Sequence, residues 1–169
     1  MTPRDLDLRV PANAALLAHL SATRRGARAT AEGAPVESCP PDAVADPRMR
    51  LGTHPDVVER LWDELGGALP LPCQWVAWGA PALVHPRTGV VFAFAGGTVY
   101  ALRLLGTDVA EALRAGAEQV HDFPAYPALG IAASSLDLRT IGPEWVFGGW
   151  RREEPAWCHA AFEAAGALR

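Results

Sequence analysis

The alternation of apolar and polar residues divides the chain into helical and extended stretches. After Thr53, apolar residues recur at helical spacing and charged residues fill the opposite face, which predicts an amphipathic helix capped by Thr53. An earlier Leu-rich helix is expected to stop at Gly26, since glycine commonly follows the last helical turn. The predicted helices cover about 12–25, 53–67, 108–120 and 155–165.

Between about Cys73 and Leu104 the period changes to short aromatic and β-branched stretches separated by turn signals. This pattern predicts four strands in an antiparallel meander. Its stretch GVVFAFA is apolar on both faces, so we expect a central strand covered on both sides. A further hairpin is expected from LDLRTI and WVFGGW, joined by the turn GPE.

Strands that run together, and do not alternate with helices, predict an α+β class. The expected architecture is a mainly antiparallel meander sheet of about four to six strands, packed with about four helices. Two stretches show neither the helical nor the strand spacing of apolar residues. They are residues 27–52, rich in Pro and Ala, and the stretch HDFPAYPALGIAASS. We interpret the 169 residues as a single domain with an irregular arm or loop at about 27–52.

Composition narrows the function classes. All 15 basic residues are Arg, so Schiff-base lysine chemistry and lysine-dependent phosphate loops are excluded. The net charge of −4 argues against binding of nucleic acid or anionic membranes. The three Cys are far apart and form no C-x-x-C pair, which favours reduced thiols and a cytoplasmic location. We expect neither a signal peptide nor a membrane anchor.

Cys158 and His159 are adjacent in the sequence, and a Cys and a His can act together as a nucleophile and its general base. On a helix beginning at Pro155, Cys158 falls in the apolar stripe, whereas His159 lies about 100° away, on the side of Glu163. Neighbouring helical residues do not face each other. We therefore predict that Cys158 is a core residue and that the two side chains do not act together.

Tryptophan and arginine supply the candidate binding residues. Core packing explains most of the six Trp, but an exposed Trp beside Arg is typical of binding hot spots. The entrance to the terminal helix combines both residue types with acidic side chains. The turn VHPRTG offers a second polar pair, although a hairpin explains it without a function. The candidate binding residues are Trp145, Trp150, Arg151, Glu154, His85 and Arg87.

The leading hypothesis is a soluble, non-catalytic binding protein with an accessory or regulatory role. The chain has no catalytic motif, no metal-ligand spacing and no phosphate loop, so we predict no metal and no cofactor. The expected partner is another protein, bound through residues 27–52 and the Trp145–Trp157 region.

Two alternatives remain open. One is a small enzyme whose site combines dispersed Cys, His and Arg residues, for example Cys73 or Cys158 with His85 or His121. The other is a small-molecule binder with an aromatic pocket lined by Trp75 or Trp78.

Overall fold

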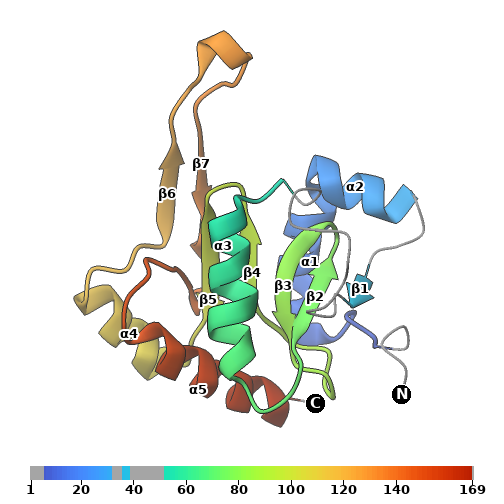
Figure 1. Ribbon diagram of the computed structural model, residues 1–169, viewed down its shortest axis with the longest axis vertical. Coiled ribbons are helices and arrows are strands. Elements are labelled where there is room, and N and C mark those ends of the chain that lie inside the picture. Colours follow the sequence, from blue (N-terminus) through green and yellow to red (C-terminus); the bar gives the residue numbers. More distant parts are fainter. Residues whose placement is uncertain (1–5, 32–35, 39–51, 169) are drawn as a thin grey trace.

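The computed structural model describes residues 6–31, 36–38 and 52–168. These residues form an α+β structure with a six-stranded sheet in the order β1-β2-β3-β4-β5-β8 and a two-stranded sheet of β6 and β7. Helices lie on both faces of the larger sheet (Figure 1). The predicted fold class is therefore confirmed.

All neighbouring strands of the larger sheet are antiparallel, and β2 to β5 follow one another along the chain as the predicted meander. Strand β8 extends this meander by pairing with β5. The strands are β1 (Val36–Ser38), β2 (Gln74–Ala77), β3 (Ala80–Val84), β4 (Val91–Gly96), β5 (Val99–Arg103) and β8 (Trp145–Phe147).

The helices fall before, between and after the strands of the meander. The predicted amphipathic helix consists of two parts, an α-helical turn that continues directly into a π-helical one. His54, not Thr53, is its N-cap, and the His54 side chain accepts a hydrogen bond from the backbone N–H of Asp56. The helices are α1 (Ala14–Ala22), α2 (Arg24–Ala31), α3 (Pro55–Glu59), η4 (Arg60–Leu65), η5 (Gly66–Ala68), α4 (Gly106–Arg114) and α5 (Glu154–Ala167), and η2 (Pro11–Asn13) precedes α1.

The core consists of two apolar clusters, one on each face of the sheet. Central strand β4 contributes Phe92 to one cluster and Phe94 to the other, which confirms the prediction of a strand covered on both sides. The first cluster includes the apolar faces of α3, η4 and α5. The second includes Leu16 and Leu20 of α1 together with Leu138. Burial of both faces of the sheet is the main contribution to stability.

The prediction of one helix ending at Gly26 is wrong. The chain bends at Thr23, whose backbone is extended, and α2 starts directly afterwards. The Thr23 hydroxyl accepts a hydrogen bond from the N–H of Gly26 at 3.0 Å, so Thr23 caps α2. Gly26 lies inside α2, where a Cβ would overlap the carbonyl oxygen of Leu20. Glycine is required there because α1 and α2 approach closely, and helix α2 occupies the start of the segment predicted to be irregular.

Two predictions for the second half of the chain are also wrong. Helix α4 ends at Arg114, because Gly116, with φ of 88°, closes it in a left-handed conformation. Residues beyond it form β6 (Val120–Phe123), which pairs with β7 (Ser134–Asp137), so both ends of the stretch HDFPAYPALGIAASS, predicted to be irregular, belong to strands. The segment before β8 is a 3₁₀ turn, η7 (Leu138–Thr140), so the hairpin expected from LDLRTI and WVFGGW does not form.

None of the helices in the described part of the chain has the length and apolar character that a membrane crossing requires.

Candidate functional site

The structure brings together only part of the predicted binding residues. Trp150, Arg151 and Glu154 lie at the entrance to α5, as their spacing suggested. Trp145 is buried on the opposite face of the sheet, where its ring packs edge-on against Phe94 at 5.2 Å. It is therefore separated from the other three.

Glu154 is fully buried at the centre of a polar network. One oxygen of its carboxylate accepts hydrogen bonds from the Tyr100 hydroxyl and, at 3.1 Å, from Nη2 of Arg60. The other oxygen accepts a hydrogen bond from the backbone N–H of Gly149 at 2.6 Å. The Tyr100 hydroxyl in turn accepts a hydrogen bond from the backbone N–H of Trp150 at 2.9 Å. The network thus joins β5, η4, the loop after β8 and the start of α5.

Electrostatics favours one ionisation state for this network. Burial, together with the Glu154 carboxylate, raises the pKa of Tyr100, so its hydroxyl stays protonated and donates to Glu154. Burial alone would favour neutral Arg60, but hydrogen bonds to Tyr100, Glu64 and Glu154 outweigh it and raise its pKa. Among the described residues, no buried side-chain nitrogen or oxygen lacks a partner. The network is thus organised to hold four segments together.

Trp150 contacts this network and is exposed to solvent. The residue is 50% exposed, and its backbone has the left-handed φ of 54° that is uncommon for residues other than glycine. The Trp150 ring packs edge-on against Tyr100 at 5.0 Å. Next to it, Nη2 of Arg151 donates to the carbonyl of Gly116 at 2.8 Å. This contact places the loop carrying Trp150 beside the segment that leads into β6.

His85 and Arg87 lie at the other end of α5, in the turn between β3 and β4. His85 is buried, and its ring contacts Phe162 of α5 at 4.7 Å. Burial and the nearby Arg87 guanidinium lower the pKa of His85. Arg87 is exposed. The predicted candidates therefore occupy separate places and form no single site.

The thiols of the described residues are inaccessible. Cys73 and Cys158 are fully buried in the first core cluster, and burial raises the pKa of each to about 12. A reactive cysteine needs an exposed thiol with a lowered pKa, so neither residue suits the thiol enzyme considered from sequence. Cys39 lies outside the described residues.

No group of His, Cys, Asp or Glu in the described ranges is arranged to hold a metal ion.

A projecting β-hairpin, residues 120–137, is the most distinctive surface feature. The two strands leave the body of the molecule and extend well beyond it (Figure 1). At the tip, Tyr126 and Ile131 exchange backbone hydrogen bonds of 2.8 and 3.1 Å. The 3₁₀ turn η6 (Pro127–Leu129) closes the tip, and Gly130 follows it in the left-handed conformation with φ of 66°. We call residues 120–137 the arm from here on. This segment is different from the irregular segment 27–52 that was predicted from the sequence.

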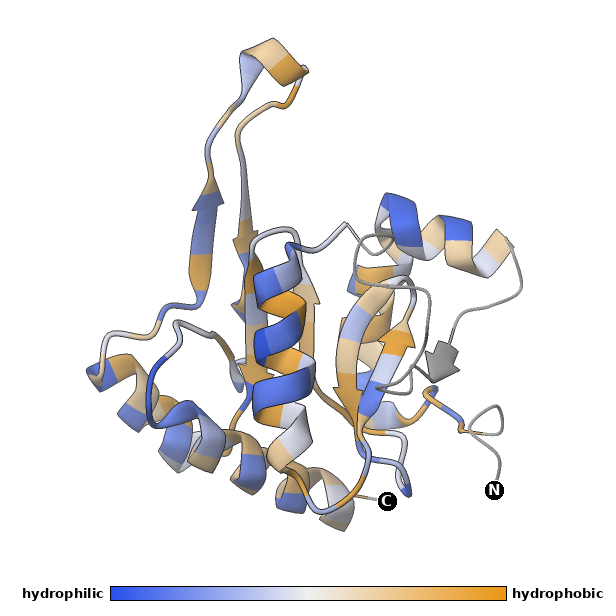
Figure 2. Cartoon of the chain, viewed as in Figure 1, coloured by the Kyte–Doolittle hydropathy of each residue, from blue (hydrophilic) through white to orange (hydrophobic). Residues whose placement is uncertain are grey.

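The tip of the arm is apolar although it is exposed to solvent. Tyr126, Leu129 and Ile131 are 54%, 73% and 49% exposed, and Figure 2 shows the hydrophobic colouring of the tip. From Phe123 to Leu136 the sequence has no charged residue. An exposed apolar cluster of this kind is typical of an interaction site.

The base of the arm is fastened to the larger sheet. The N–H of Phe147 in β8 donates to the carbonyl of Glu118 at 2.8 Å, and Nε2 of Gln119 donates to the carbonyl of Trp145 in the same strand at 3.0 Å. The N–H of Leu138 closes the base by donating to the carbonyl of Gln119 at 2.8 Å. The His121 ring packs near Phe123 at 4.7 Å and near Phe147 at 5.6 Å. The direction of the arm is therefore set by the sheet.

Sequence reasoning missed the arm as a functional element. Its signal was the uncharged run from Phe123 to Leu136, enclosed by Asp122 and Asp137. The predicted contact segment 27–52 cannot be compared with it, because most of that segment lies outside the described residues.

No family model, curated protein or solved structure matches this chain.

Proposed function

We propose that this protein is a non-catalytic binding protein that docks on a partner protein through its arm. The observation that carries the proposal is the exposed, uncharged tip formed by Tyr126, Leu129 and Ile131. Partner proteins commonly bury such groups at the centre of an interface, where aromatic residues are enriched and charged ones are depleted.

The shape of the arm supports insertion into a groove of the partner. An isolated two-stranded hairpin is only marginally stable in water, because it lacks a second layer to cover its apolar side chains. Here the bonds at the tip and at the base hold the hairpin in one shape before binding. A preformed element loses less conformational entropy on association. We therefore assign the partner an apolar groove that admits a narrow hairpin.

Trp150 extends the proposed surface toward the base of the arm. Its loop lies beside residues 116–118, which lead directly into β6. Trp and Arg are enriched among residues that dominate binding energies. The proposal thus keeps Trp150 and Arg151 from the sequence-based surface and adds the arm as its main part.

Affinity purification from the native organism tests this function. The variant Leu129→Asp places a charge at the tip, and Leu113→Asp, on the exposed side of α4, is the matched control. We expect wild type and the control to retain the same partner, and the tip variant to lose it. Retention by all three proteins, or no partner with wild type, would contradict the proposal. Light scattering on the eluted complex gives the mass of the partner.

A further inference from the structure

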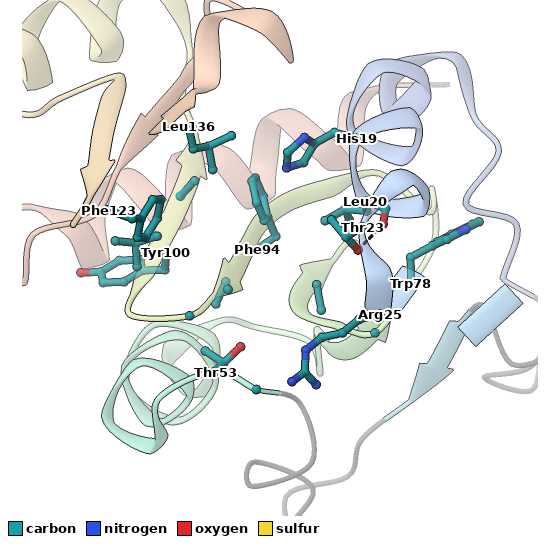
Figure 3. Close-up of a pocket in the computed structure, with 18 of the residues that line it drawn as sticks. His19, Leu20, Thr23, Arg25, Thr53, Trp78, Phe94, Tyr100, Phe123 and Leu136 are labelled. Carbon is teal, nitrogen blue, oxygen red and sulfur yellow. Dashed lines mark hydrogen bonds between the residues drawn. The ribbon is translucent and has the colours of Figure 1, made fainter. Parts of the chain in front are cut away.

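A cavity of about 340 Å³ lies at the base of the arm, between α1, α2 and the second face of the sheet (Figure 3). We infer that this cavity is a binding site for a small, uncharged aromatic molecule. The inference concerns a second ligand and does not depend on the partner of the arm.

The cavity has an apolar interior and a polar rim. Its deepest walls are buried side chains, including Leu20, Phe94 and Phe147. Tyr100 also borders the cavity, but its ring points away, toward the other face of the sheet (Figure 3). Ligand pockets typically combine mainly apolar walls with a few polar groups that orient the ligand.

The arm supplies one wall of the cavity. Phe123 of β6 and Leu136 of β7 line it together with Val99 of β5. The rings of Phe94, Phe123 and Phe147 therefore lie around the same space, contributed by three different strands. Aromatic rings favour aromatic partners through offset and edge-to-face contacts. A ligand here would contact both the sheet and the base of the arm.

The polar groups favour an uncharged ligand. Among the described residues that line the cavity there is no Asp or Glu, and their one cationic side chain is Arg25, which lies at the exposed rim against Gly52. His19 is half-buried, and burial lowers its pKa, so its ring is neutral near pH 7. A neutral imidazole carries one donor and one acceptor nitrogen, and the Ser134 hydroxyl can donate or accept. The Thr23 hydroxyl already donates to the carbonyl of Leu20 and accepts from the N–H of Gly26.

The size of the cavity sets the size of the ligand. An apolar protein cavity of about 150 Å³ can hold one benzene ring. The observed volume of about 340 Å³ is therefore large enough for two fused rings with one polar group. Gly96 and Gly97 also line the cavity, and a Cβ at either residue would meet no atom within 4 Å, so this part of the wall borders open space. Indole has the required size, planarity and single donor.

Titration of isotope-labelled full-length protein with indole, followed by NMR, tests the inference. We expect saturable shifts of lining residues and intermolecular contacts between indole and the Phe94 ring. Val99→Phe and Leu136→Phe each fill part of the cavity, and we expect either to weaken indole binding by at least about tenfold. Val120→Phe, on the arm but outside the lining, is the matched control and keeps wild-type affinity.

Several results would overturn the inference. They are the absence of saturable shifts in wild type, unchanged affinity in the folded filling variants, and equal loss in the control. If one filling variant does not fold, the other and the contacts to Phe94 decide. Stronger binding of indole-3-acetate than of indole by tenfold or more, about 1.4 kcal/mol, would overturn the uncharged class.

Discussion

Glu154 is the residue on which the entrance to α5 depends. Its neighbours Tyr100 and Arg60 precede it by 54 and 94 positions, so their convergence has no local sequence signal. Local reasoning placed Glu154 at a helix start but could not predict that it is fully buried. It did predict the burial of Cys158 and the position of His159 on the side of Glu163, because helical period alone decides which face each occupies.

Replacing the buried carboxylate tests the importance of the network. Glu154→Gln leaves Arg60 without its buried counter-charge, although Glu64 still contacts it at 2.7 Å. We expect the free energy of unfolding, measured by urea denaturation, to fall by about 3 kcal/mol. The neighbouring exposed Glu153→Gln is the control and leaves stability essentially unchanged. Equal stability of the two variants would show that the network is dispensable.

One buried and one half-buried histidine make the stability of the fold sensitive to mild acid. Burial lowers the pKa of His85, with help from Arg87, and lowers that of His19. As the pH falls from about 7.5 to about 5.5, the unfolded chain binds protons that these histidines do not bind in the folded chain. The free energy of unfolding should therefore decrease over this range.

His85→Asn identifies the part of that decrease due to His85. Asparagine offers a similar acceptor to the backbone N–H of Arg87, which contacts Nδ1 of His85 at 3.4 Å, but it does not titrate. We expect a shallower pH dependence in the variant, measured by urea denaturation at several pH values. Parallel curves for variant and wild type would contradict this assignment.

At the scale of elements, the sequence predicted the buried strands correctly and missed the exposed ones. The strands from β2 to β5 have apolar residues facing the core and turn residues between them, so their period is visible. The arm has no core to face, and its strands β6 and β7 are mostly exposed. A hairpin without a buried face has no reason to alternate, and this is why it resembled an irregular stretch.

The turn between β8 and α5 gives an element-scale test. A Cβ at Gly148 would overlap the buried Tyr100 ring, whereas the atoms nearest to a Cβ at Gly149 belong to the guanidinium group of the long Arg151 side chain. We expect Gly148→Ala to lower the free energy of unfolding by about 2 kcal/mol, the usual size of an overpacking effect. Thermal and urea unfolding of Gly149→Ala provide the comparison, and a loss of similar size there would refute the steric explanation.

At the scale of the whole molecule, the arm and the cavity meet. The sheet holds the arm through the Glu118 carbonyl and the Gln119 side chain, and both arm strands contribute side chains to the cavity wall. The cavity combines segments that are distant in sequence, from α1 to β8, so no local pattern predicts it. The same arrangement lets one scaffold hold a preformed arm and a cavity beside its base.

The central claim is that the tip of the arm contacts a partner protein, and site-specific photo-crosslinking in the native organism tests it most directly. A photoreactive phenylalanine analogue replaces Leu129 at the tip or, as the control, the exposed Leu113 of α4. We expect one discrete adduct, identified by mass spectrometry, from position 129 and none from position 113. The absence of an adduct at the tip, or the same adduct from both positions, would contradict the claim.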